Sequence, residues 1–277
     1  MPELPEVETV RRGLSEAVVG RRIDRVEVGR ERTVRRTSRQ ALIDGLTGVS
    51  ILEVQRRGKY LLAPLDSGYW MMVHLRMSGR LLLAEAGAVR PPHTHVALTL
   101  GSDELWFVDP RTFGEVVVYD PERASEEMPE LARLGVDPVT DPFDHKVLAR
   151  ALGGTSRAVK TVLLDQHRIA GLGNIYTDEV LHRARVRFDR PASALRPAEI
   201  LRLAQAITEV LLAAIQAGGS TLDDTQYVDV AGRTGEFQHQ HLVYGRQDEG
   251  CLTCEKAVIK RSTVGGRSTF FCPRCQR

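Results

Sequence analysis

The sequence contains few cysteines, few lysines and no long hydrophobic run, and each shortage narrows the possible functions. No apolar run in the 277 residues approaches the ~20 residues that a membrane-spanning helix needs, so no contact with a membrane is expected. The acidic start lacks the basic and then apolar layout of a secretion signal, which predicts a cytoplasmic protein. Only five of the 38 basic residues are lysine. A lysine in an unusual place is therefore a candidate chemical group, because lysine can release its proton and arginine cannot.

Charge is spread unevenly along a chain whose formal net charge is only +2. Residues 21–39 hold eight arginines against three acids, and the tail 251–277 holds six basic residues against Glu255 alone. Residues 102–144, by contrast, carry twelve acids and three arginines. This asymmetry favours basic surfaces that bind a polyanion such as nucleic acid. Solvated faces of arginine-rich strands and helices would give the same pattern, so charge alone leaves both interpretations open.

The first 120 residues predict a helix followed by many short strands. Apolar residues recur at helical spacing over 5–19, and Pro5 suits the first turn, where its missing N–H costs nothing. Beyond Gly20, turn residues separate strand-like segments at short intervals, which is typical of an antiparallel sandwich or barrel. These segments are IDRVEV, ILEVQ, KYLLAPL, YWMMVHL, RLLLAE, HVALTL, ELWFV and EVVVY.

Helical periodicity replaces the strand pattern after a proline- and acid-rich stretch, 121–145, that is typical of a linker. A polar, glycine-rich stretch at 218–241 predicts a long loop, and uncovered loops of that length are usually functional or disordered. The residues after this loop form a separate small module. Helices are expected near residues 145–152, 156–166, 174–184 and 197–217.

All four cysteines lie in the last module, as two Cys-x2-Cys pairs. Cys251 and Cys254 are separated from Cys272 and Cys275 by 17 residues, a spacing within the range of tetrahedral zinc sites. Four thiolates leave no open position for a substrate, so the zinc would be structural and would supply folding energy to a module with little core. Disulfides are the alternative, which a cytoplasmic location disfavours. The basic stretch between the pairs alternates like a β-hairpin, which suits either contact with nucleic acid or a folding staple alone.

Three turns carry side chains suited to nucleic acid. In AGLGNIYTDE, two glycines precede a helix that starts near Asn174, where backbone N–H groups suit a phosphate, although a tight interhelical turn needs the same glycines. HLRMSG carries Met77, and DPRTFG carries Arg111 and Phe113. Apolar side chains on turns can act as wedges between stacked bases, whereas Met and Phe are more often core residues.

Together these motifs resemble the formamidopyrimidine-DNA glycosylase family, bacterial enzymes that excise oxidised purines. The resemblance spans nearly the whole chain, and Leu4 favours the purine-repair branch because the sister endonuclease VIII branch typically starts with PEGPE. The motifs that carry it, in order, are MPELPEVETVRRGL, QRRGKYLL, HLRMSG, DPRTFG, LLDQ with AGLGNIYTDE, and VYGR followed by GRSTFFCPRCQ.

The resemblance implies an α+β multidomain protein with DNA across a cleft. An N-terminal helix and antiparallel β-sandwich would occupy residues 1–130, and a helical domain with a helix–two-turns–helix element would occupy 131–236. The loop 218–241 would bind the lesion, and a zinc-finger β-hairpin would occupy 237–277. Damaged double-stranded DNA is the implied partner and one structural zinc ion the implied cofactor, with no small-molecule cofactor. One cleft per chain predicts a monomer, and the bacterial family predicts a cytoplasmic, nucleoid-associated location.

The resemblance also implies a role for each matching residue. Pro2, exposed once Met1 is removed, matches the family nucleophile. Glu3 matches its acid/base, and Lys59 matches its lysine for strand cleavage. Arg267 matches a phosphate-binding position linked to the final elimination. Met77, Arg111 and Phe113 match the side chains that fill the gap left by an extruded nucleotide. Lys160 and Asn174 match phosphate-binding positions, and His93 matches a DNA contact near the active site.

The chemistry of the first residues can also be argued from their functional groups. A free α-amine has a pKa near ~8, so part of it is neutral and nucleophilic at pH 7. The secondary amine of Pro2 can attack C1′ of a deoxyribose and form an iminium ion once the base departs. That cation acidifies the C2′ proton, so the strand can break by elimination, and the adjacent Glu3 carboxyl can move the protons. Because stacking blocks C1′ in a duplex, the nucleotide must be flipped out.

Two stretches depart from the family pattern. Glu236, in TGEFQHQH, stands where relatives often carry an aromatic residue, which leaves the lesion preference open. GGTSRAVK lacks the usual basic cluster and leaves Thr155 at one DNA-contact position, with Arg157 nearby. The alternatives are an oxidised-pyrimidine glycosylase and a non-catalytic DNA-damage binder. The intact catalytic set argues against the binder.

Overall fold

The computed structural model describes residues 1–222 and 227–277, which fold into two compact units. The predicted boundaries placed 217–236 with the helical domain and treated 237–277 as a separate module, whereas the structure groups both differently. Within the described residues, no helix is long and apolar enough to cross a membrane. The units are, first, Met1–Arg133 with Ala217–Glu236 and, second, Leu134–Gln216 with Phe237–Arg277.

The regrouping has a physical cause in each case. The N–H of Leu83 donates to the carbonyl of Val230 at 3.0 Å, which ties the segment 217–236 to a strand of the first unit. The C-terminal β-hairpin is joined to the helices by Lys160 and Asp178, a buried ion pair whose members also bind Thr269 and the N–H of Phe270 in the hairpin.

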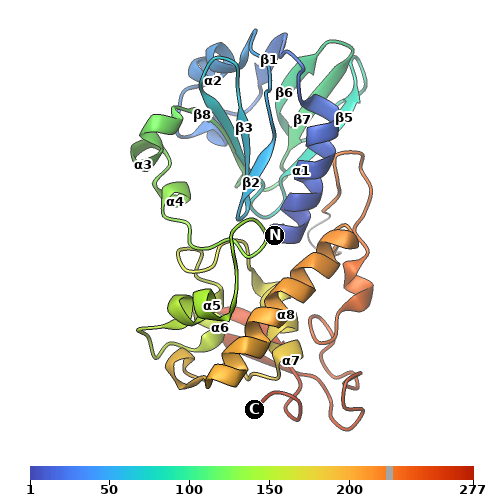
Figure 1. Ribbon diagram of the computed structural model, residues 1–277. Coiled ribbons are helices and arrows are strands. Elements are labelled where there is room, and N and C mark those ends of the chain that lie inside the picture. The colour runs from blue at the N-terminus through green and yellow to red at the C-terminus, as the bar shows by residue number, and fades with distance from the viewer. Residues whose placement is uncertain (223–226) are drawn as a thin grey trace. The chain divides into compact units, whose positions relative to one another are not determined.

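Two four-stranded antiparallel sheets form the sandwich of the first unit (Figure 1), as predicted. Their strand orders are β1-β6-β7-β5 and β2-β3-β4-β8. Helix α1 (Leu4–Val18) contacts β2 and β3. The predicted strand ILEVQ is the exception, because only Gln55 joins β2 whereas Ile51 forms an isolated bridge to Leu65. The strands are β1 (Arg25–Val28), β2 (Gln55–Arg57), β3 (Tyr60–Pro64), β4 (Trp70–His74), β5 (Arg80–Glu85), β6 (Thr94–Leu100), β7 (Asp103–Val108) and β8 (Glu115–Tyr119).

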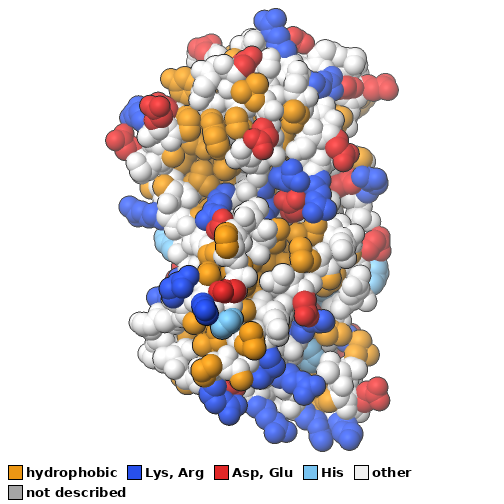
Figure 2. Space-filling model, viewed as in Figure 1, with side chains coloured by type: hydrophobic (Ala, Val, Ile, Leu, Met, Phe, Trp, Pro, Cys, Tyr) orange, Lys and Arg blue, Asp and Glu red, His pale blue; other side chains and the backbone are white. Residues whose placement is uncertain are grey.

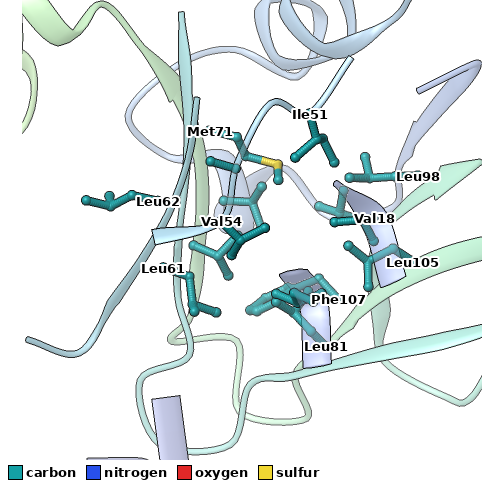
Figure 3. Close-up of a pocket in the computed structure, with 15 residues that line it drawn as sticks. Val18, Ile51, Val54, Leu61, Leu62, Met71, Leu81, Leu98, Leu105 and Phe107 are labelled. Atoms are coloured by element: carbon teal, nitrogen blue, oxygen red, sulfur yellow. The ribbon is translucent and has the colours of Figure 1, made fainter. Parts of the chain in front are cut away.

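Apolar side chains from both sheets and from α1 meet in one core (Figure 3). Leu61 and Met71 come from one sheet, Leu105 and Phe107 from the other, and Val18 from α1. The hollow among them measures about 20 Å³, room for no more than roughly one water, and every lining residue is apolar. This hollow is therefore part of the packed core and not a ligand site.

Several short helices of the first unit are not predicted from the sequence. Helix α2 (Arg39–Leu46) begins where the Ser38 hydroxyl accepts a bond from the N–H of Ala41, and it buries only Leu42 and Leu46. Only two of its eight residues are buried and Gly45 lies inside it, so the local sequence gives a weak helical signal. The other short helices are η1 (Glu31–Val34), η2 (Pro121–Arg123), α3 (Ala124–Glu127) and α4 (Pro129–Ala132). Three of these short helices, η2, α3 and α4, lie within the stretch predicted as a linker.

The second unit combines helices with a β-hairpin that packs on α7. Asp144 caps α5 through a carboxylate that accepts two backbone N–H bonds. The helix predicted at 156–166 is shorter than expected, because the chain turns at Asp165, whose carboxylate accepts the N–H of His167. The elements are α5 (His145–Leu152), α6 (Val159–Leu163), α7 (Asn174–Ala184), η3 (Ala192–Ala194), α8 (Pro197–Gln216), η4 (Phe237–Gln240), β9 (Lys260–Val264) and β10 (Arg267–Phe271).

Candidate active site and nucleic-acid interface

Pro2 and Glu3 lie directly before α1, and both are buried. Glu3 is the N-cap of that helix, and its side chain accepts a bond from the backbone N–H of Glu6. The N–H of Glu3 in turn donates to Glu6 Oε2 at 2.8 Å. This reciprocal capping box pairs two N–H groups that a helix start otherwise leaves unsatisfied. The expected nucleophile and acid/base are therefore held at a hydrogen-bonded helix end.

Glu6 also connects this helix end to the segment expected to bind the lesion. Its second oxygen, Oε1, accepts the N–H of Ser220 at 2.7 Å, and the hydroxyl of Tyr227 donates to its carbonyl at 3.3 Å. Gly219 has a φ of 81°, and a Cβ there would lie 2.9 Å from Glu6 Cγ, so only glycine fits. Glu6 is not among the site residues predicted from the sequence. Its partners are more than 210 positions away, and no local pattern signals them.

Lys59 lies in the turn between β2 and β3 and is buried, with 6% of its surface exposed. The same turn is fastened to α1 by a buried ion pair, in which Arg56 Nε donates to Glu8 Oε2 at 3.1 Å. Arg56 Nη1 also donates to the carbonyl of Gly58 at 2.9 Å. The helix that follows Pro2 and the turn that carries Lys59 are thus joined by one clamp within the first unit.

Met77, Phe113 and Arg111 occupy two loops of the sandwich, β4–β5 and β7–β8. The side chains of Met77 and Phe113 are both 38% exposed, so they are not core residues. The Arg111 guanidinium lies over the Phe113 ring at 5.2 Å from its centroid, a cation–π contact that pairs the two side chains. His93 is exposed in a neighbouring segment before β6 and has a φ of 67°. These side chains are available to a ligand.

Lys160 is fully buried, contrary to the expectation that it contacts a DNA phosphate. Its ammonium donates to Asp178 Oδ1 at 2.7 Å, to Thr269 Oγ1 at 2.9 Å and to the carbonyl of Ser268 at 3.1 Å. A direct phosphate contact would require these bonds to break. The side chain instead fastens β10 to α6 and α7.

Asn174 and Arg267 both lie beside Ser268, the residue of β10 whose carbonyl binds Lys160. Asn174 Nδ2 donates at 2.9 Å to the Ser268 carbonyl that Lys160 also binds. Arg267 directly precedes Ser268, is exposed, and lines a hollow of about 350 Å³ together with Arg157. Asp165 lines the same hollow and pairs with Arg157 at 3.0 Å, so the charged groups of the lining carry one net positive charge.

Basic side chains also gather at the end of the second unit near the C-terminus (Figure 2). A hollow of about 480 Å³ lies there with a single glutamate, Glu199, in its lining. Two of the arginines in this lining belong to the basic tail 251–277, and the other four come from residues 185–202. The arginines that line this hollow are Arg185, Arg190, Arg196, Arg202, Arg274 and Arg277.

The four cysteines converge on one point of the second unit, with their sulfurs within 4.8 Å of one another. The Sγ atoms of Cys251 and Cys275 lie 3.8 Å apart, as do those of Cys254 and Cys272. These distances exclude disulfides, whose sulfurs are about 2.05 Å apart. Tetrahedral zinc with Zn–S bonds of about 2.3 Å would place its sulfurs about 3.8 Å apart. The cluster fits such an ion.

Two family models match the chain. The formamidopyrimidine-DNA glycosylase N-terminal domain matches residues 1–116, and the formamidopyrimidine-DNA glycosylase H2TH domain matches residues 134–226. The chain belongs to the formamidopyrimidine-DNA glycosylase family. The curated formamidopyrimidine-DNA glycosylases of Gluconobacter oxydans and Desulfitobacterium hafniense are 44% and 41% identical to it, and both alignments cover 100% of each chain.

Solved structures of glycosylase–DNA complexes share the fold. The Lactococcus lactis formamidopyrimidine-DNA glycosylase bound to DNA with an abasic site has a TM-score of 0.90 at 36% identity, over 99% of both chains. The wild-type enzyme of the same organism bound to DNA containing an oxidised pyrimidine also has a TM-score of 0.90 at 36% identity, over 100% of both chains. These likenesses cover the sandwich, the helices and the cysteine-bearing hairpin alike.

Membership of the formamidopyrimidine-DNA glycosylase family confirms the α+β fold expected from the motifs. The residues expected for catalysis and for filling the gap in DNA all belong to the first unit: Pro2, Glu3, Lys59, Met77, Arg111 and Phe113. Within the second unit the structure joins Lys160, Asn174 and the hairpin that carries Arg267. Their individual roles stay predictions.

His74, at the end of β4, makes the stability of the first unit sensitive to acid. Burial, helped by the charges of Arg76, Lys59 and Arg36, lowers the pKa of His74 well below 6.5. Its Nδ1 accepts the N–H of Arg76 at 3.0 Å, which fits the neutral ring. Below about pH 6.5 the histidine of the unfolded chain binds a proton and that of the folded protein stays neutral, so the free energy of unfolding decreases as the pH is lowered.

We therefore expect the free energy of unfolding, measured with urea, to fall more steeply with decreasing pH in the wild type than in His74→Gln. Between pH 6.5 and 5.5 the difference should reach about 1 kcal/mol, because the histidine of the unfolded chain goes from roughly half to roughly nine-tenths protonated over this pH unit. The exposed His145 provides the matched control, and His145→Gln should keep the wild-type slope. Equal slopes for His74→Gln and the wild type would mean that His74 titrates normally in the folded protein.

Proposed function

We propose that this chain is a bifunctional DNA glycosylase and abasic-site lyase that removes oxidised purines, such as 8-oxoguanine and formamidopyrimidines, from duplex DNA in base excision repair. The observation that carries this proposal is the buried start of α1. There Glu3 is held by the capping box directly after the buried Pro2, and the Glu8–Arg56 pair fastens the turn of Lys59 to the same helix.

The reaction follows from these groups. The nitrogen of Pro2 bonds to C1′ of the damaged nucleotide as the bond from C1′ to the base breaks, and the base leaves with a proton. Glu3 protonates the opening sugar oxygen, and Lys59 favours ring opening or orients the 5′ phosphate. The resulting iminium ion loses its C2′ proton, which expels the 3′ phosphate. A second elimination, in which Arg267 takes part, releases the 5′ phosphate, and water frees Pro2.

The DNA-binding roles rest on exposure and charge. Met77, Arg111 and Phe113 enter the space left by the flipped nucleotide, since two of them are exposed apolar side chains on adjacent loops. Asn174 and Arg267 bind phosphates beside the Ser268 anchor, and His93 contacts DNA from its exposed turn. One N-terminal amine per chain is sufficient, so the protein acts as a monomer, bound to the nucleoid in the bacterial cytoplasm.

One zinc ion held by Cys251, Cys254, Cys272 and Cys275 completes the hairpin. The two 3.8 Å sulfur separations support it, and the donor set suits zinc. With four thiolates the ion has no open position, so it supplies structure only.

A second candidate function is excision of oxidised pyrimidines by the same chemistry. It is favoured by the acidic Glu236 in the expected lesion loop and by the Lactococcus lactis relative, whose structure contains DNA with an oxidised pyrimidine. Residues 223–226 of that loop lie outside the described residues. The shared amine chemistry therefore leaves the lesion to be decided by experiment.

Borohydride trapping tests the proposed function. With a duplex that contains 8-oxoguanine opposite cytosine, the protein should form a covalent adduct, because borohydride reduces the iminium ion. Single-turnover rates on this duplex should exceed those on a thymine glycol duplex by about tenfold or more, a discrimination of ~1.4 kcal/mol. A faster rate on the thymine glycol duplex would favour excision of oxidised pyrimidines. A mobility shift without any adduct or cleavage would indicate a non-catalytic DNA-damage binder.

A further inference from the structure

Asp109 is a fully buried carboxylate at the end of β7 that the proposed chemistry does not use. In the part of the chain that the structure describes, it pairs with no cation and binds uncharged donors. Oδ1 accepts the hydroxyl of Ser78 and the N–H of Arg111, the latter at 3.2 Å, and Oδ2 accepts the N–H of Gly114 at 2.7 Å. A buried carboxylate is costly unless such bonds compensate it.

The three donors flank the three side chains that are proposed to enter DNA. Ser78 directly follows Met77, Gly114 directly follows Phe113, and the third donor is the N–H of Arg111 itself. One side chain therefore fixes both loops, β4–β5 and β7–β8.

The backbone of Asp109 extends the same anchor to the neighbouring histidine segment. Its N–H donates to the carbonyl of His93 at 3.0 Å, and its carbonyl lies 2.9 Å from His95 Nε2. Arg76 and Thr112 have φ values of 52° and 56°, a conformation that non-glycine residues adopt only when their surroundings impose it. The loops are thus held in one arrangement by bonds that converge on a single residue.

We propose that Asp109 is a positioning residue that presets both loops, so that Met77, Arg111 and Phe113 enter the duplex as one unit when the damaged nucleotide leaves the stack. The inference rests on the proposed function and adds a residue to it. Preset loops bind without the entropy cost of ordering flexible ones. An amide cannot replace the carboxylate, because its NH₂ group would face the N–H of Gly114 or the donors at Oδ1.

The test compares substrates that do and do not need insertion into a stack. In Asp109→Asn, the single-turnover excision of 8-oxoguanine from a duplex should fall about 10- to 100-fold, the range for a lost buried polar bond. Borohydride trapping on an abasic site in single-stranded DNA, where no base pair is opened, should stay within about twofold of wild type. A fluorescent 2-aminopurine opposite the lesion should show less unstacking than with the wild type.

Two variants keep the result interpretable. Asp137 is also fully buried, and its carboxylate accepts the N–H groups of Val139 and Thr140, so Asp137→Asn is a matched control that should leave both substrates unaffected. Ser78→Ala removes one of the three bonds and keeps the carboxylate, so it should show a smaller loss confined to the duplex. It preserves the test if Asp109→Asn folds poorly.

The outcomes separate this inference from the proposed function. The inference would be overturned if Asp109→Asn and Ser78→Ala both lost as much activity on the single-stranded substrate as on the duplex. It would also be overturned if Asp109→Asn excised the lesion from the duplex at the wild-type rate. Adding Asp109→Asn to a Met77→Ala, Phe113→Ala background should cost little more than the background alone, and full additivity would contradict a shared action. Failure of the wild type itself to trap would instead reject the proposed function.

Discussion

A preparation that retains Met1 should bind abasic duplex DNA and fail to cut it. With Met1 attached, the nitrogen of Pro2 is a tertiary amide that has no nucleophilic lone pair. The amine of Met1 lies one residue further along, about 3.8 Å by Cα spacing, and a misplacement of ~1 Å can already cost about 10²-fold. We expect cleavage to fall at least ~10³-fold, with affinity for DNA within about twofold of the processed form. Gel-based cleavage and fluorescence anisotropy measure the two quantities.

The matched control is the same preparation after treatment with a methionine aminopeptidase. Cleavage should return, and mass spectrometry of the borohydride adduct should place the DNA on the peptide that starts with Pro2. An adduct on Lys59, or undiminished cleavage by the Met1 form, would reject Pro2 as nucleophile. Because the two forms differ only in Met1, no other change in the sequence can explain the difference in cleavage.

The residues that could be predicted are those whose chemistry is visible in the residue itself. An N-terminal proline, an adjacent acid and a scarce lysine are informative without any structure, and two Cys-x2-Cys pairs specify a metal geometry through their spacing. Glu6 and Asp109 are different. Their importance arises from partners 214 and 31 positions away, at Ser220 and Ser78, and a carboxylate has no local pattern that announces such partners.

The same distinction separates the elements of the fold. Most sandwich strands are short apolar runs bounded by turn residues, so they could be located from the sequence, although β3, β4 and β7 are buried almost throughout and do not alternate. The segment 217–236 could not be assigned to the first unit, since its attachment depends on pairs such as Leu83–Val230. For a related reason, the burial of Lys160 was not predicted. A lysine before a glycine-rich helix start suggests a phosphate ligand, and only Asp178 and Thr269 reveal that it is buried.

Removal of the metal should weaken DNA binding by at least about tenfold, or ~1.4 kcal/mol. Two of the four cysteines, Cys251 and Cys272, are buried in the small core of the hairpin module, and structural zinc contributes roughly 10–16 kcal/mol to comparable modules. The Lys160–Asp178 pair opposes this loss, because it holds β10 on α7 whether or not metal is bound. That anchor ends at Ser268, so Arg267 lies just beyond it and is the residue that should become disordered.

Arg267→Ala supplies the control that distinguishes local from general unfolding. In the zinc-loaded protein this variant should lose about as much affinity as the metal-free wild type. Metal removal from Arg267→Ala should then add less than about threefold, since the two changes act through one residue. Anisotropy titrations at fixed salt measure all four states, because phosphate contacts make affinity salt-dependent. Unchanged affinity in the metal-free wild type would show that the Lys160–Asp178 anchor alone positions the hairpin, and full additivity would show that zinc supports DNA contacts other than Arg267.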